Sequence, residues 1–136
     1  MVRASSIAIF LLLGGTLISA SCGGGTLGRP DGGSGTSSGL PRGTTIANLT
    51  PAQAARLCDW GDNKEGGYGR TVTCADGSTV STDPDSATCA SALPVYGSGC
   101  PGATVGDVED CLNAVGADLC ALDTAPKCNR FRSCLQ

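Results

Sequence analysis

The apolar positions of the chain follow three successive patterns. Residues 7–13 form an uninterrupted apolar run, whereas residues 23–48 are rich in glycine, serine and threonine and contain few large apolar side chains. From residue 49 onward, apolar residues recur in short segments that begin at capping residues. These patterns predict a leader at residues 1–21, a flexible tether at 22–48 and a folded domain at 49–136.

Three segments of the predicted domain carry helix-start signals. Thr50 to Gln53 has the form of a capping box with proline at the first helical position. Asp83 to Ser86 repeats the cap and proline, and Thr104 to Asp107 caps a third helix that Gly116 ends. Residues 125–135 predict a fourth segment with one apolar face. In the third helix the residues at helical spacing are Val105, Val108, Cys111, Leu112 and Val115.

Between the first two helices, residues 71–81 alternate in polarity around Asp76 and Gly77. This arrangement predicts a hairpin with a two-residue turn. The expected fold is therefore a small, disulfide-rich and mostly α domain. It has three to four short helices and one small β-hairpin, and it follows a disordered N-terminal tether.

The chain has 9 cysteines, and 8 of them follow residue 57. Large apolar residues are few in the predicted domain, and a domain of this size buries only about 60–65% of its unfolded surface. Cysteine at this density behind an export leader predicts disulfides formed in an oxidising compartment. Eight cysteines allow 105 pairings, and the sequence does not select one. The expected disulfide cysteines are Cys58, Cys74, Cys89, Cys100, Cys111, Cys120, Cys128 and Cys134.

The leader has a charged start at Arg3, an apolar middle that is shorter than the ~20 residues of a membrane span, and a small-residue exit. The exit, from Ile18 to Gly23, resembles the lipobox of bacterial lipoproteins, although Ser19 stands where that family prefers leucine. The resemblance implies cleavage before Cys22 and lipidation of its thiol, with an acyl chain such as palmitate on the new amino terminus. Setting Cys22 aside also leaves an even number of cysteines for pairing.

Several buried acyl chains would anchor the mature protein firmly to a membrane, and the membrane is its expected partner. Gly23 is similar to the residue that lets such lipoproteins leave the inner membrane. The expected location is therefore the bacterial cell envelope, in the outer membrane if the cell has two, facing the periplasm or the surface. A protein or polysaccharide partner stays unspecified.

Three motifs in residues 50–136 resemble cysteine-rich lipoproteins of soil-dwelling Gram-negative bacteria. They are Cys58-Asp59-Trp60, Gly67-Tyr68-Gly69 and the helix from Val105 to Cys111. No activity comes with this resemblance.

Candidate chemistry is sparse. Histidine is absent, so neither a Ser-His-Asp nor a Cys-His relay can form, and no close cysteine pair suggests a metal site. We therefore expect no catalytic residue, metal or cofactor. The net charge of −3, without a basic patch, argues against nucleic acid as a partner.

A few polar or aromatic residues have alternative interpretations. Asp107, Glu109 and Asp110 suit the first turns of a helix, where the macrodipole favours negative charge. Residues 59–65 are expected to form a solvated loop, with calcium binding as the weaker alternative, because the ligand spacing of a calcium loop is missing. Trp60 is expected to pack in the core rather than to stack on a sugar.

These observations predict a membrane-anchored, non-catalytic lipoprotein that serves envelope interaction or structure. Two alternatives stay open. One is a hydrolase or hydrolase inhibitor that acts in the envelope or on extracellular polymers. The other is a secreted cysteine-rich effector, which requires that Cys22 carry no lipid.

Overall fold

The structure, a computed structural model, describes residues 35–132, with the side chains of residues 131 and 132 excepted. The expected signal peptide, Cys22, the tether up to residue 34 and Cys134 lie outside these residues. The elements in chain order are η1 (Ile46–Asn48), α1 (Pro51–Glu65), β1 (Thr71–Thr73), β2 (Thr79–Ser81), α2 (Ser86–Gly99), α3 (Val105–Val115), η2 (Leu119–Asp123), η3 (Pro126–Cys128) and α4 (Asn129–Arg132), where η marks a 3-10 helix. The mostly helical fold with one hairpin is confirmed.

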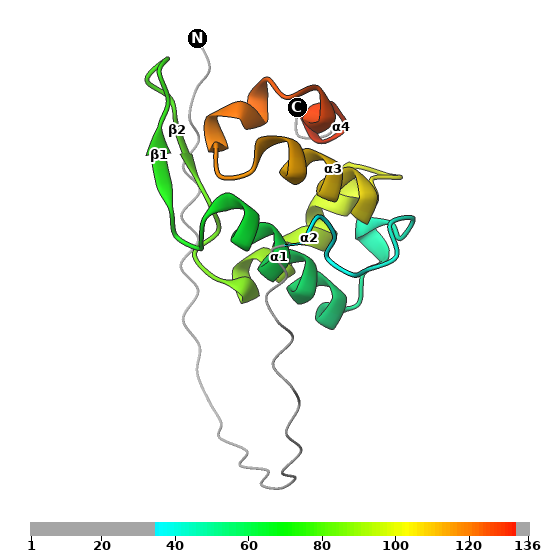
Figure 1. Ribbon diagram of the computed structural model, residues 1–136. Coiled ribbons are helices and arrows are strands. Elements are labelled where there is room, and N and C mark those ends of the chain that lie inside the picture. Colours follow the sequence, from blue (N-terminus) through cyan, green and yellow to red (C-terminus); the bar gives the residue numbers. More distant parts are fainter. Residues whose placement is uncertain (1–34, 133–136) are drawn as a thin grey trace, which may run out of the picture.

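The helices pack around a small core, and the hairpin stands at the side of the domain (Figure 1). Helix α1 packs against both α2 and α3, and α3 also packs against η3. The buried apolar cluster comprises Leu40, Ile46, Leu49, Ala54, Leu57, Trp60, Cys100, Ala103, Val105, Cys111, Leu112, Val115 and Cys128. Trp60 is only 4% exposed and donates its indole N–H to the carbonyl of Gly35, so it packs as expected.

Local capping chemistry sets the helix starts. The Thr50 hydroxyl accepts the Gln53 backbone N–H, and the Gln53 side chain accepts the Thr50 backbone N–H. Thr104 and Asp107 form the same reciprocal box at α3, which ends at Gly116. Both caps are confirmed, and both satisfy N–H groups that a helix start leaves without partners.

The start of α2 differs from the prediction. Its cap is Asp85, whose carboxylate accepts the Thr88 N–H, and not Asp83. The Asp83 carbonyl accepts the backbone N–H of Gly69 instead, and Thr82 N–H donates to the Arg70 carbonyl. Asp83 therefore continues the extended pairing that leads out of the hairpin, and the helix can begin only beyond it.

The hairpin lies where the sequence predicts it, but its turn is longer. Thr73 pairs with Thr79, and Cys74 donates its N–H to the Ser78 carbonyl at 2.8 Å. The loop is therefore residues 75–77, and the predicted two-residue turn is wrong. Gly77, with φ of 82°, takes the left-handed position that ends such three-residue loops.

Residues 35–48, which we call the N-terminal arm, pack on the helices. Ile46 is 1% exposed and donates its N–H to the Ala103 carbonyl at 2.9 Å, and Leu40 and Ser38 are also buried. The backbone of Thr45 bridges to Thr104. The prediction of a flexible tether up to Asn48 is therefore wrong for the arm, because these contacts offset the entropy lost on ordering it.

Residues 59–65 are also not a loop. They form the second half of α1, which continues to Glu65 and ends at Gly66 with φ of 92°. The apolar and cysteine positions Leu57, Cys58 and Gly61 are buried along this helix. Their burial against α2 and α3 stabilises a helix through a segment whose charges alone suggest a solvated turn.

Disulfides connect elements that are distant in sequence. Cys58 of α1 is bonded to Cys89 of α2, Cys111 of α3 to Cys128 of η3, and Cys74 beside β1 to Cys120 of η2. Cys100 is disulfide-bonded as well. The expectation that helical cysteines link neighbouring elements is confirmed for α1, α2 and α3.

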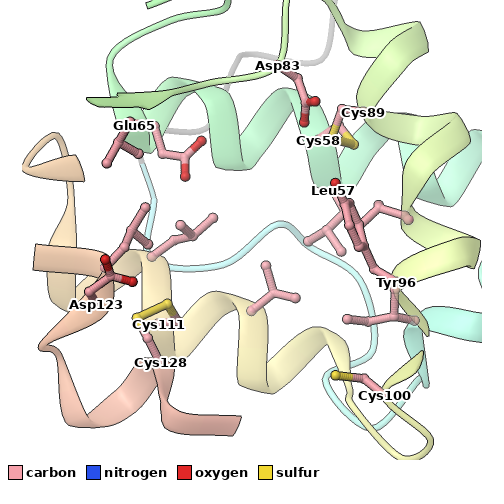
Figure 2. A pocket seen from close by; sticks show the side chains of 16 residues that line it. Leu57, Cys58, Glu65, Asp83, Cys89, Tyr96, Cys100, Cys111, Asp123 and Cys128 are labelled. Atoms are coloured by element: carbon pink, nitrogen blue, oxygen red, sulfur yellow. A yellow bond between two sulfur atoms is a disulfide. The ribbon is translucent and has the colours of Figure 1, made fainter. Parts of the chain in front are cut away.

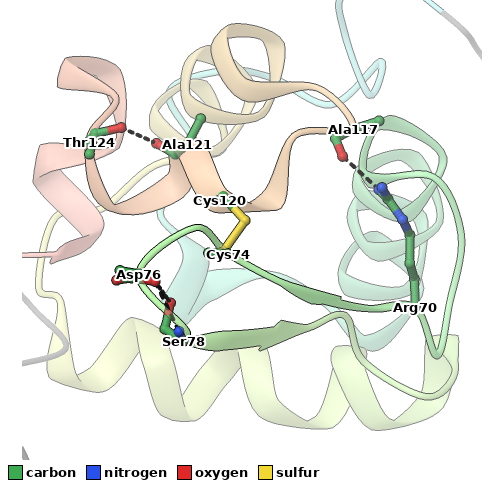
Figure 3. The surroundings of a disulfide bond; sticks show 8 residues. All are labelled: Arg70, Cys74, Asp76, Ser78, Ala117, Cys120, Ala121 and Thr124. Atoms are coloured by element: carbon green, nitrogen blue, oxygen red, sulfur yellow. Dashed lines mark hydrogen bonds between the residues drawn. A yellow bond between two sulfur atoms is a disulfide. The ribbon is translucent and has the colours of Figure 1, made fainter.

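The third of these bonds fixes the hairpin to the C-terminal half (Figure 3). At the other end of the hairpin, the Arg70 guanidinium donates to the carbonyls of Ala117 and Glu65. The hairpin is therefore held at both ends, by a covalent bond near its tip and by hydrogen bonds at its base.

Candidate ligand-binding cavity

A cavity of about 420 Å³ lies between α1, α2 and α3 and extends to β2, η2 and η3 (Figure 2). Its volume is within the range of about 300–1,000 Å³ that is typical of small-ligand pockets. Most of its wall is apolar. The apolar side chains are Ile46, Leu57, Val80, Leu93, Val108, Leu112 and Leu122, together with Tyr96, and the cysteines are Cys58, Cys89, Cys100, Cys111 and Cys128.

Helical spacing places the wall residues on one face of each helix. On α1, Glu65 lies eight positions after Leu57 and seven after Cys58, which is about two helical turns. The wall residues of α2 and α3 also recur at intervals of three or four positions. They are Cys89, Leu93 and Tyr96 on α2, Cys100 directly after it, and Val108, Cys111 and Leu112 on α3.

Two disulfides lie in the wall itself. The Cys58–Cys89 bond joins α1 to α2, and the Cys111–Cys128 bond joins α3 to η3 (Figure 2). An apolar cavity without an occupant forfeits the dispersion contacts that close packing provides. Each bond fixes the separation of the two elements that it joins. The helices are therefore less free to move and close the cavity.

Three carboxyl groups interrupt the apolar wall. Glu65 comes from the end of α1, Asp83 from the segment before α2, and Asp123 from η2. In Figure 2, Glu65 and Asp83 lie along the upper edge of the cavity, Asp123 lies at the lower left, and Cys100 lies at the lower right. The cavity therefore has an acidic side, formed by Glu65 and Asp83, and an apolar side near Cys100.

The local environment disfavours negative charge on the acidic side. Burial, and then the charges of Asp62 and Asp83, raise the pKa of Glu65 to about 7. Burial, and then the charge of Asp85, also raise the pKa of Asp83. The charges that act most on these two carboxyl groups are therefore negative as well, which disfavours their ionised forms.

Tyr96 forms part of the apolar side and also reaches solvent. Its side chain is 49% exposed, and its neighbour Val95 is 69% exposed. An apolar residue such as Val95 is expected in the core. Val95 is exposed instead, because α2 turns another face to the cavity. Tyr96 therefore marks a point at which the cavity wall meets the protein surface.

A second polar cluster lies away from the cavity, around Glu109. This glutamate is 0% exposed, and its Oε1 accepts the Ser38 N–H at 2.6 Å and the hydroxyls of Ser38 and Ser37. Arg42 donates to its Oε2 at 2.8 Å and to Asp110 at 2.7 Å. The cluster fastens the N-terminal arm to α3.

The pKa of Glu109 reflects these contacts. Burial alone raises it, but the hydrogen bonds from Ser38 and Ser37 and the charge of Arg42 outweigh burial and hold the pKa below its usual value. Glu109 is therefore a charged group with partners, and its role is structural. Among the three acidic residues of α3, Asp107 lies in the first turn, where the helix macrodipole favours negative charge, and it also belongs to the capping box.

The residues singled out from the sequence are distributed unevenly over the structure. The cysteines expected to form disulfides supply part of the cavity wall, whereas Cys22 and Cys134 lie outside the described residues. Trp60 is buried beneath the arm and does not reach the cavity wall. Sequence reasoning missed Glu65 as a cavity residue, and the available signal was its spacing from Leu57 and Cys58.

Residues 35–132 contain no group of three or more cysteine, aspartate or glutamate side chains that could hold a metal ion. In the same range, no helix combines the length and the apolar character that crossing a membrane demands. Comparison of the chain with protein-family models, with curated proteins and with solved structures found no match.

Proposed function

We propose that the protein is an exported, lipid-anchored and non-catalytic module that binds a small apolar molecule in its cavity. The observation that carries the binding proposal is the cavity of about 420 Å³ with apolar walls that disulfides cross-link. Binding of an apolar body there removes its surface from water and restores missing contacts in the core.

Three features support the export and the anchor. Disulfides persist in oxidising compartments, and seven cysteines of the described part of the chain are disulfide-bonded. The leader pattern precedes them, and Cys22 follows the small residues of the exit. The absence of histidine from the sequence supports a non-catalytic role, since the commonest acid–base group is missing.

The cavity proposal predicts that a neutral apolar fluorophore, N-phenyl-1-naphthylamine, binds the oxidised mature chain with a saturable rise in fluorescence. Val108→Trp fills the cavity with a larger side chain, and we expect it to weaken binding at least about 10-fold. The matched control is Ala114→Trp, on the exposed face of the same helix, which leaves binding unchanged.

Two further results make this test decisive. Circular dichroism and a mass-spectrometric thiol count must show that the Val108→Trp protein is folded and oxidised. If it does not fold, Leu122→Trp, on η2, is the second cavity-filling variant. Equal binding by a folded cavity-filling variant and by the control would refute the cavity as the binding site.

The anchor proposal predicts that the mature protein from membranes begins at Cys22 and carries the mass of a diacylglyceryl group and an acyl chain. The Cys22→Ala variant is expected to keep its leader and to lack the lipid mass, while the nearby Thr26→Ala variant is processed normally. An intact mass that corresponds to an unmodified mature chain would support the secreted alternative and would exclude the anchor.

A further inference from the structure

The charges along the cavity wall limit the kind of ligand that the proposed function allows. Glu65, Asp83 and Asp123 line the cavity, and the lining residues include neither lysine nor arginine. Glu65 and Asp83 are half-buried, whereas Asp123 is exposed. An anion placed there would meet carboxyl groups and no lining cation. A cation beside Glu65 and Asp83 would meet complementary charge in a partly buried setting, where such attraction is stronger than in water.

Within residues 35–132, the ion pairs join arginines to Glu109, Asp110 and Asp107, and none of these pairs involves a carboxyl group of the cavity. Arg70 is close to Glu65, yet its guanidinium donates to the Glu65 backbone carbonyl and to Ala117. The carboxyl groups of the cavity are therefore available to a ligand.

The arrangement of polar and apolar groups also defines the shape of the ligand. Glu65 and Asp83 lie along the upper edge of the cavity, and Cys100 lies at its lower end (Figure 2). Leu57, Leu93 and Leu112 supply apolar surface between the helices. A matching molecule has a charged head at one end and an apolar body at the other.

We propose that the cavity binds a small amphipathic cation, an ammonium group attached to an alkyl or aryl body. The ammonium group lies against the carboxyl groups of Glu65 and Asp83, and the body lies among Leu57, Leu93 and Leu112. This inference rests on the proposed binding function and adds the chemical class of the ligand.

The test compares three eight-carbon probes that differ in their head group: octylammonium, octanol and octanoate. Isothermal titration uses the mature chain from residue 23, exported behind a cleavable secretory leader so that its disulfides form and no lipid or detergent is present. We expect octylammonium to bind at least about 10-fold more tightly than octanol, and octanoate to bind more weakly than either. Lengthening the ammonium probe by one methylene tightens binding about four-fold, which is equivalent to about 0.8 kcal/mol.

The carboxyl groups are tested by Glu65→Gln and Asp83→Asn, which keep the shape of each side chain and remove its charge. Each variant is expected to reduce the preference for octylammonium over octanol about 10-fold and to leave octanol binding nearly unchanged. Asp118→Asn is the matched control, because Asp118 is exposed and its side chain makes no cap hydrogen bond. If one variant does not fold, the other still decides the outcome.

The pH dependence gives an independent readout. Octylammonium stays charged up to a pH near 10, like a lysine side chain, so its own titration does not interfere. Glu65, with a pKa of about 7, becomes charged as the pH rises through neutrality. The charges of Asp62, on its own helix, and of Asp83, before α2, act on Glu65. Asp123 of η2 lines the same cavity, and the Arg70 guanidinium at the hairpin base donates to the Glu65 backbone carbonyl. Octylammonium binding is therefore expected to strengthen several-fold between pH 5.5 and pH 8, and Glu65→Gln removes most of this increase.

The outcomes separate the two proposals. Equal affinity for octanol and octylammonium, or the tightest binding for octanoate, would overturn the cationic ligand class and leave the apolar-cavity function intact. No binding of any probe, together with no binding of the neutral fluorophore, would overturn both.

Discussion

Reduction of the protein with dithiothreitol is expected to unfold residues 35–132 at 25 °C. The Cys58–Cys89, Cys74–Cys120 and Cys111–Cys128 bonds close loops with separations of 31, 46 and 17 residues. In the chain-entropy model, each bond of this kind destabilises the unfolded state by about 3–4 kcal/mol. Since a typical domain is stable by only about 5–15 kcal/mol, the loss of these three bonds, together with that of Cys100, removes most or all of the stability. Far-UV circular dichroism before and after reduction measures the loss of helix.

Pairwise substitutions distinguish the individual bonds. Replacing Cys58 and Cys89 by alanine is expected to lower the free energy of unfolding by about 4 kcal/mol and to weaken probe binding, because this bond lies in the cavity wall. Replacing Cys74 and Cys120 lowers stability by a similar amount but spares the cavity, which neither cysteine lines. A reduced protein that keeps its helical signal and its denaturation midpoint would contradict the dependence on disulfides.

Replacing Glu109 by alanine is expected to destabilise the protein by about 3 kcal/mol and to release the N-terminal arm. The substitution leaves the Ser38 N–H and the hydroxyls of Ser37 and Ser38 without their acceptor and removes the partner of Arg42. Urea denaturation measures the loss of stability. Faster tryptic cleavage after Arg42, measured by mass spectrometry, reports release of the arm.

Glu109→Gln separates the charge from the shape of the side chain. Because the pKa of Glu109 is below its usual value in the folded protein, its charge adds stability above a pH of about 4.5, and this contribution is lost as the pH falls further. The stability difference between the native protein and the Glu109→Gln variant should therefore be present at pH 7 and shrink below pH 4. Asp118→Asn is the control, since Asp118 is exposed and makes no cap hydrogen bond, and its substitution should change the midpoint only slightly. A variant lacking Glu109 that retains native stability and protease resistance would show that the arm is held by other contacts.

The helix starts at Thr50 and Thr104 could be predicted because a capping box depends on residues only three positions apart. Asp83 shows the limit of such local signals. Proline follows Asp83 and not Asp85, so the local pattern favours Asp83 as the cap, but the Asp83 carbonyl is bonded to the Gly69 N–H across the base of the hairpin. The hairpin loop, residues 75–77, is likewise one residue longer than the Asp76-Gly77 pair suggests, because strand register rather than that pair fixes the loop length.

Residues 59–65 and the arm show how burial overrides composition. The charges of residues 59–65 suggest a solvated loop, yet Trp60 and Gly61 are buried within that stretch, which is helical. The arm is rich in glycine, serine and threonine, yet Ile46 and the serines that bond Glu109 hold it on α3. Neither result is visible in a short window of sequence, because the partners are distant along the chain.

The sequence by itself determined the class of the fold: helices from their caps, a hairpin from its alternation, and dependence on disulfides from many cysteines and few large apolar residues. These properties follow from composition and from contacts within a few residues. Only the tertiary structure decided which cysteines pair, that Glu109 is buried beneath the arm, and that Glu65, Asp83 and Asp123 share one apolar cavity. Such features arise where separate elements meet, and the free energy that selects them comes from packing between residues tens of positions apart.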